Sequence, residues 1–233
     1  MSTPGRFNGG PHRHLTADEA WDLSFLGALP AHVQTDLRSS ALGMTIPPGH
    51  IIYRNDDHAR LVLIVSGRAR IVASSPEGRK ATIRYARSAD CVGSMSVVTR
   101  SQPVMAQAIT EAEVLFINVD RLRRFAHTEP EVGWQLAQFV GTVATQVIEM
   151  MTAALFGSVR QRLAQHLLDL SVHYDDRLIV VVDQQEIADA IGSVREVIAR
   201  TLKEFRERNL ISRTPNGLQL DNPDELHAIA LGA

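Results

Sequence analysis

Residues Asp183–Asn209, DQQEIADAIGSVREVIARTLKEFRERN, have the pattern of two short helices joined at a glycine. Asp183 and Glu186 are spaced as a capping box, so the first helix is expected to begin near Gln184. Gly192 supplies the permissive backbone that a tight turn between two helices requires. The stretch therefore predicts a helix-turn-helix unit, a structure that can place its second helix in the major groove of DNA.

The second helix, expected from about Ser193, has an apolar side and a charged side. The apolar side is expected to be buried and consists of Val194, Val197, Ile198, Leu202 and Phe205. On the charged side, Arg195 can donate two hydrogen bonds to guanine and Glu196 can accept one from cytosine, so the pair suits G·C base pairs. The alternative is an ordinary solvated helix face, which carries charges of both signs as well.

A hairpin is predicted directly after this helix. The segment from Leu210 to Thr214 is followed by the turn residues 215–217 and by the alternating segment Leu218–Leu220. Helix, turn, helix and hairpin together indicate a winged helix-turn-helix domain, with expected boundaries at residues 156 and 233.

These residues resemble the catabolite activator and fumarate-nitrate regulator (Crp/Fnr) family of bacterial transcription factors. The likeness rests on residues 184–211, QQEIADAIGSVREVIARTLKEFRERNLI, extends back through Ser158–Ala164, and is weaker over residues 23–125. In cyclic-AMP-binding members an Arg-Glu pair and a later Arg read the operator. The resemblance carries that role onto Arg195, Glu196 and Arg200 and implies a TGTGA-like half-site, although Val197 replaces the usual threonine. The expected contacts to the DNA backbone are Ser193, Thr201, Lys203 and Arg213.

Composition narrows the function class less than these motifs do. The 233 residues are 45% hydrophobic and 21% charged with a net charge of −2, so the chain as a whole is not a basic nucleic-acid binder. Positive charge is local instead: residues 193–213 hold six Arg or Lys against three Glu. The single cysteine fits a reducing cytoplasm. Residues 1–18 are expected to be a flexible tail and not a signal peptide, and no apolar stretch is long enough for a membrane span.

Residues 130–155 are expected to form a long dimerisation helix. Six residues alternate spacings of four and three, as in the seam of a two-stranded coiled coil: Leu136, Val140, Val143, Val147, Met150 and Ala154. The alternative is a helix packed on its own domain. A homodimer also suits the reading helix, because two-fold symmetry matches palindromic half-sites.

Upstream, residues 44–118 have the pattern of short strands separated by turns, which favours a sandwich or barrel. The resemblance implies the β-roll of the family, with an expected sensor domain at residues 19–129. The predicted fold class is thus α+β: an N-terminal β-roll of the cyclic-nucleotide-binding kind, a long dimerisation helix and a C-terminal winged helix-turn-helix.

The segment from Gly93 to Ala106, here called the sensor cassette, departs from the pattern of cyclic-AMP-binding members. Those members carry Gly-Glu, whose Glu grips the ribose, and a later Arg that neutralises the cyclic phosphate; here Gly93 is followed by Ser94, and residues 101–106 contain no Arg. Because a phosphate buried without a cation is costly, binding of cyclic AMP in the standard way is disfavoured and the effector stays unknown. The candidate effector-pocket residues are Cys91, Gly93, Ser94, Arg100, Ser101, Gln102, Val147 and Ile148.

Other sensors can be weighed in the same way. An iron-sulfur cluster needs four thiolates, which one cysteine cannot supply. Haem ligands by residue type are His12, His14, His32, His50 and His58, with no spacing that singles one out. Cys91 is expected to be a buried core side chain and not a redox switch, since no Lys, Arg or His adjoins it in the sequence.

Two further function classes stay open as alternatives. One is a cyclic-nucleotide-dependent regulator with a non-standard pocket, and the other is a metal-dependent β-barrel enzyme fused to a DNA-binding tail. The enzyme would need converging His and carboxylate ligands, and no His-x-His-x-Glu cluster occurs in residues 44–118. We therefore expect no enzyme and no metal site, but a cytoplasmic regulator whose partners are double-stranded DNA, a second copy of itself and, as a further candidate, RNA polymerase.

Overall fold

The computed structural model describes residues 15–54, 60–74, 80–99, 104–174, 177–181, 183–215 and 217–232. The contacts divide the chain into two compact units, one of residues Leu15–Leu155 and one that contains Phe156–Ala233. Each unit is described by itself. No helix in these described ranges combines the length and the apolar character that crossing a membrane requires.

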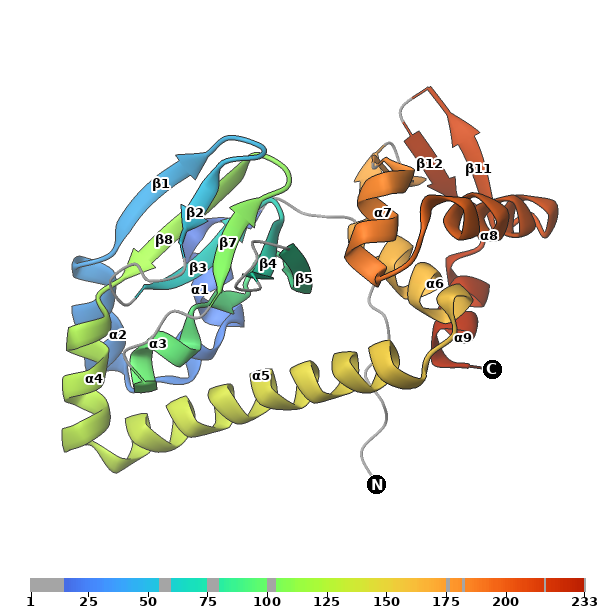
Figure 1. The fold of residues 1–233 in the computed structure, drawn as a ribbon. Helices are drawn as coiled ribbons and strands as arrows, with labels where there is room; N and C mark the ends of the chain where they lie inside the picture. Colours follow the sequence, from blue (N-terminus) through green and yellow to red (C-terminus); the bar gives the residue numbers. More distant parts are fainter. Residues whose placement is uncertain are drawn as a thin grey trace. The chain divides into compact units, whose positions relative to one another are not determined.

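The first unit is built around two four-stranded antiparallel sheets, in the orders β1-β8-β3-β6 and β2-β7-β4-β5. The strands are β1 (Leu42–Ile46), β2 (Ile51–Tyr53), β3 (Leu61–Ser66), β4 (Ala69–Ser74), β5 (Lys80–Ala86), β6 (Cys91–Val92), β7 (Met105–Ala108) and β8 (Ala112–Ile117). Figure 1 shows the two sheets as the body of a β-roll.

Strand β3 is buried along its whole length because both faces of its sheet are covered. Val62 and Ile64 pack in the core between the two sheets, whereas Leu61 and Leu63 pack in a second core against helices. This is why β3 reads in the sequence as an unbroken apolar run and not as an alternation.

The helices of the first unit are α1 (Ala17–Leu23), the 3₁₀ helix η1 (Phe25–Ala28), α2 (Ala31–Ser39), α3 (Ser94–Thr99), α4 (Val119–Thr128) and α5 (Pro130–Phe156). Helix α1 begins with a capping box between Thr16 and Glu19, so the tail expected over residues 1–18 does not reach that far. Stacking of Phe25 on Phe139, with ring centroids 4.1 Å apart, ties η1 to α5. The first turns of α5 thus belong to the core of this unit.

The second unit contains α6 (Val159–Leu170), β9 (Val172–Tyr174), β10 (Arg177–Val180), α7 (Gln184–Ile191), α8 (Arg195–Glu207), β11 (Ile211–Thr214), β12 (Gly217–Leu220) and α9 (Pro223–Leu231). The predicted hairpin is β11–β12, and it continues into a four-stranded sheet of order β11-β12-β10-β9. Strands β9 and β10 and helix α9 were not predicted. One core joins α6, α7, α8 and α9 through buried residues such as Leu167, Ile187 and Phe205.

The predicted fold class is confirmed: a β-roll, a long helix and a C-terminal winged helix-turn-helix follow one another along the chain (Figure 1). Helix α7 begins at Gln184 as predicted, with the capping box between Asp183 and Glu186 formed. Helix α8 begins at Arg195, two residues later than predicted, because Val194 keeps an extended backbone as its N-cap.

Candidate nucleic-acid interface and sensor cassette

The turn between α7 and α8 depends on Gly192. Its φ of 64° lies in the left-handed region, where a side chain would be strained, and it ends α7 as the C-cap. The N–H of Ser193 then donates to the carbonyl of Ala188 over 2.8 Å. These backbone contacts hold the start of α8 against α7, so the residues at that start have a defined direction.

Helix α8 buries one side and exposes the other. Ile198, Leu202 and Phe205 are fully buried, while Arg195, Glu196 and Arg200 are all exposed. Within the described residues, no hydrogen bond or ion pair engages the side chains of these three. Their charges are therefore available to a ligand, in contrast with Lys203 and Glu207, which pair over 3.7 Å along the same helix.

Two expectations for α8 are corrected by burial. Thr201 is buried and its hydroxyl donates to the carbonyl of Val197 over 2.9 Å, so it does not offer the expected contact to a DNA phosphate. Val194, predicted in the buried stripe, is 61% exposed. Ser193 is half-buried at the turn, and Arg213 is exposed on β11 of the wing.

The sensor cassette lies where β6 ends and α3 begins. Gly93 has a φ of 90°, and Ser94 is 4% exposed as the first residue of α3. The hydroxyl of Ser96 bonds to the carbonyls of Gly93 at 2.7 Å and Arg60 at 2.9 Å. The candidate pocket residues Arg100, Ser101 and Gln102 lie outside the described residues.

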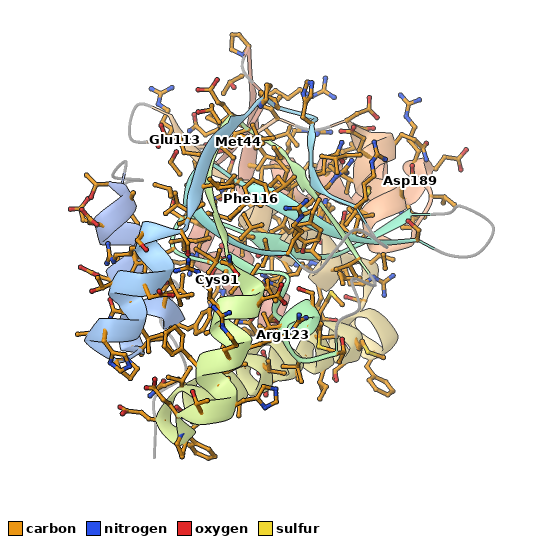
Figure 2. The ribbon with its side chains drawn as sticks, turned by 90° about the vertical axis from the view of Figure 1, so that its left-hand side faces the viewer. Met44, Cys91, Glu113, Phe116, Arg123 and Asp189 are labelled. Carbon is orange, nitrogen blue, oxygen red and sulfur yellow. The ribbon has the colours of Figure 1, made fainter. Side chains whose placement is uncertain are left out.

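Arg123 of α4 holds the other end of α3. Its guanidinium donates to the carbonyl of Val97 over 2.7 Å and to that of Ser96, and it pairs with Asp120 at 2.9 Å. These carbonyls belong to the last turn of α3, which has no intrahelical partners for them. Arg123 therefore caps α3 and is committed to backbone contacts (Figure 2).

Cys91 lies in β6, paired with Leu63 of β3, and is buried in the core between the sheet and the helices (Figure 2). Burial strongly raises the pKa of its thiol, while a hydrogen bond with Ser24 acts in the opposite direction. A protonated, buried thiol is a poor nucleophile. These features fit a core side chain.

Arg84 is a cation of the roll that sequence reasoning missed. It lies on β5, opposite Ile71 of β4, on the face that packs between the sheets. Its side chain is 18% exposed. Its contact with the carboxylate of Asp90 is a loose one at 3.7 Å. The alternation Arg84, Ala86 along β5, with Ala86 buried, is a signal that could have identified it.

Only some of the candidate metal and haem ligands lie in the described part of the chain. No cluster of three or more His, Cys, Asp or Glu side chains suited to a metal occurs among the described residues. The ring of His32 bonds to Glu129 at 3.0 Å, and that of His50 bonds to the carbonyl of Pro48 at 3.2 Å. His12, His14 and His58 lie outside the described residues.

Helix α5 carries two apolar stripes one residue apart. In the predicted stripe, Leu136 is 7% exposed and lies in the core of its own unit, and the half-buried Val140 packs against that core. Val143, Val147 and Met150 are half-buried, and the side chain of Ala154 lies outside the described part of the chain. The neighbouring stripe is exposed throughout: Trp134, Ala137, Gly141, Ala144, Ile148 and Met151.

Comparison with known proteins agrees with this architecture. Residues 44–129 match the model of the cyclic nucleotide-binding domain, and residues 161–229 match that of the Crp-like helix-turn-helix domain. A CRP-like cAMP-activated global transcriptional regulator of Mycobacterium tuberculosis is 25% identical over 211 residues, which cover 87% of this chain and 93% of that protein.

The chain belongs to the Crp/Fnr family. The cAMP-activated global transcriptional regulator CRP of Salmonella typhimurium is 26% identical over 169 residues, which cover 70% of this chain and 80% of that protein. Among solved structures, a CRP-family transcriptional regulator from Thermus thermophilus, TTHB099, has a TM-score of 0.66 and 26% identity, with 82% of this chain and 97% of that one covered. FixK2 from Bradyrhizobium japonicum shares the fold, with a TM-score of 0.68, 19% identity and coverage of 81% and 96%.

The Crp/Fnr relatives named above are transcription regulators and not enzymes. This protein is accordingly a Crp-like transcription regulator with a DNA-binding helix-turn-helix and a domain of the cyclic-nucleotide-binding kind.

Proposed function

We propose that this Crp-like regulator is a cytoplasmic homodimer that reads a palindromic, TGTGA-like operator with Arg195, Glu196 and Arg200. The observation that carries the proposal is the set of three exposed charges on α8 that no other described side chain engages. An exposed charge without a partner costs little free energy because water solvates it, and its hydrogen-bonding groups stay free to contact base edges. An arginine suits O6 and N7 of guanine, and a glutamate suits N4 of cytosine.

Contacts to the sugar-phosphate backbone would position this reading helix. Ser193 at the turn, Lys203 on α8 and Arg213 on the wing are the proposed donors, because all three keep some exposure. Such contacts carry little sequence information, but they fix the register of the protein on the duplex.

The dimer is proposed to form along the exposed stripe of α5 and not along the stripe that contains Leu136. The exposed positions 134, 137, 141, 144, 148 and 151 keep the alternation of three and four residues that a two-stranded seam requires. Gly141 has no atom within 4 Å of the place where a Cβ would stand, so a second helix could approach closely there. The occupant is a second copy, since two reading helices match the two halves of a palindrome.

The β-roll is proposed to bind an effector other than cyclic AMP in the standard mode. Ser94 is short and buried where cyclic-AMP-binding members present a glutamate, and Arg123 is committed to the carbonyls of α3. A second candidate is a cyclic-nucleotide-dependent regulator with a non-standard pocket, which Arg84 favours because it is a cation on the inner face of the roll. In both cases ligand binding would shift the population of DNA-competent dimers. RNA polymerase is a further proposed partner.

Selection of bound sequences from random double-stranded DNA tests the proposal. The purified full-length protein is expected to enrich an inverted repeat with half-site centres about 34 Å apart, or a multiple of that distance, and with G·C pairs at fixed positions. Enrichment of no common sequence would contradict sequence-specific reading. Enrichment of a single, unpaired half-site would contradict the dimer but not the reading residues.

A further inference from the structure

Val194 combines two properties that are unusual at the start of a helix. It is the N-cap of α8, yet it makes no side-chain hydrogen bond to the helix. The N-caps of α1, α4, α6, α7 and α9 all make one, and Pro30 of α2 is the other described N-cap without one. It is also 61% exposed, while Val197 is half-buried and Ile198 is fully buried in the core of the domain. An apolar N-cap in water loses both a capping bond and the benefit of burial.

The direction of this side chain follows from the backbone. Val194 has φ −111° and ψ 149°, an extended conformation that the turn at Gly192 and Ser193 leads into. Arg195 and Glu196, which follow it, are exposed as well. Three consecutive exposed side chains at the N-terminal end of a reading helix form the part that meets base edges in the major groove.

The major groove offers an apolar partner at one base only. Thymine presents a C5-methyl group there, while the other bases present hydrogen-bonding atoms at their edges. A valine beside an Arg-Glu pair therefore matches a thymine next to the G·C pairs that this pair reads.

We propose that Val194 is a specificity-determining residue that packs on the C5-methyl group of a thymine in each half-site. The inference rests on the proposed function, because it requires α8 to lie in the major groove. It explains why this position keeps an apolar side chain where serine would cap the helix. Withdrawal of one methyl group from water corresponds to about a fourfold gain in affinity.

Deoxyuridine provides the test, since it pairs as thymine does but lacks the methyl group. Each thymine of the selected operator is replaced in turn by deoxyuridine, in both half-sites together, and the affinity of the full-length protein is measured by fluorescence anisotropy. At one thymine position the wild-type protein is expected to lose affinity about fourfold per half-site. Replacement of a thymine outside the half-sites by deoxyuridine is the control and should leave the affinity unchanged.

Two variants at position 194 assign the effect. Val194→Ser removes the methyl groups and restores a capping hydroxyl, so it should bind thymine and deoxyuridine operators equally while its melting temperature is unchanged or higher. Val194→Thr keeps one methyl group and should show an intermediate preference. A melting temperature that does not fall distinguishes a lost contact from a damaged fold.

The outcomes separate the two proposals. A preference for thymine that persists undiminished in Val194→Ser, or the absence of any thymine preference in the wild-type protein, would overturn the role of Val194 and leave sequence-specific reading intact. Failure of the wild-type protein to prefer its operator over scrambled DNA would overturn the proposed function and this inference together.

Discussion

The turn into α8 and the cassette before α3 use the same backbone device and differ in their side chains. Each has a glycine with positive φ close to the start of a helix: Gly192, with φ 64°, lies three residues before Arg195, and Gly93, with φ 90°, directly precedes Ser94. Past Gly192 the chain exposes Arg195 and Glu196, whereas past Gly93 it buries Ser94 and Ser96. Among the described residues of these two segments, only the start of α8 exposes charged side chains without a partner.

Arginine illustrates the same difference. Arg195 has no partner among the described residues, while Arg123 beside the cassette donates to two carbonyls of α3 and to Asp120. A charge that is already satisfied contributes to the fold and not to ligand affinity. The charged side chains at the start of α8 are thus free to bind a ligand, whereas Arg123 and the buried Ser94 and Ser96 stabilise the roll.

The largest expected effect concerns the helix that would join two reading domains. Ile148→Glu places a charge in the exposed stripe of α5, where 63% of the isoleucine is now accessible. Burying that charge in a seam is costly, so the dimer should dissociate and operator affinity should fall by more than about 100-fold. Sedimentation velocity and operator titration measure the two effects.

Gln146→Glu is the matched control, since position 146 is exposed and lies roughly 160° around the helix from position 148. It should leave the dimer intact. An intact dimer in Ile148→Glu would refute the exposed stripe as the seam. Dissociation by Val147→Glu alone would return the seam to the stripe first predicted from the sequence.

A second prediction separates the stability of the two units. Burial lowers the pKa of His166 in α6 from 6.5 to about 4. Above pH 6.5 the histidine is neutral in both states. Between pH 6.5 and 4 the unfolded chain takes up a proton that the folded chain does not, so the second unit should lose up to about 3 kcal/mol of stability as the pH falls.

Calorimetry of the full chain at pH 7 and pH 5 measures this loss, and His166→Gln should reduce it. Tryptophan fluorescence gives an internal control, because Trp21 and Trp134 both lie in the first unit. If the pH dependence were equal in His166→Gln and in the wild type, another group would be responsible.

The smallest expected effect is that of cyclic AMP. Without the glutamate at position 94, saturating cyclic AMP should change operator affinity by less than about twofold, and isothermal titration should show no tight binding. Tight binding that Arg84→Ala abolishes would support the second candidate, a non-standard nucleotide pocket. Tight binding that Arg84→Ala leaves unchanged would contradict both accounts of the cassette.

Helices α7 and α8 could be predicted from sequence because their signals are local. The capping box at Asp183, the glycine at 192 and the apolar spacing of α8 all lie within one short stretch, and each has a direct structural meaning. The burial predicted for Val194 was wrong because an N-cap residue lacks helical geometry, so the helical period does not determine the direction of its side chain.

The exposed stripe of α5 could not be predicted in the same way. Two sets of residues with spacings of three and four run along the helix one position apart, and their different burial, greatest at Leu136, distinguishes them. Arg84 was missed for a related reason. Its alternation with Ala86 spans only two positions of β5, and the bulge between Ile71 and Val72 interrupts the strand period beyond Arg84.

The central claim, that α8 reads bases, is tested most directly by the affinity of Arg195→Ala for operator and for scrambled DNA. A lost bidentate contact to guanine should cost about 1 to 3 kcal/mol on the operator and little on scrambled DNA, with Arg200→Ala behaving alike. Lys203→Ala, on the same helix, should weaken both DNAs to a similar extent. Equal losses on both DNAs for Arg195→Ala would contradict base reading and reduce this arginine to a phosphate contact.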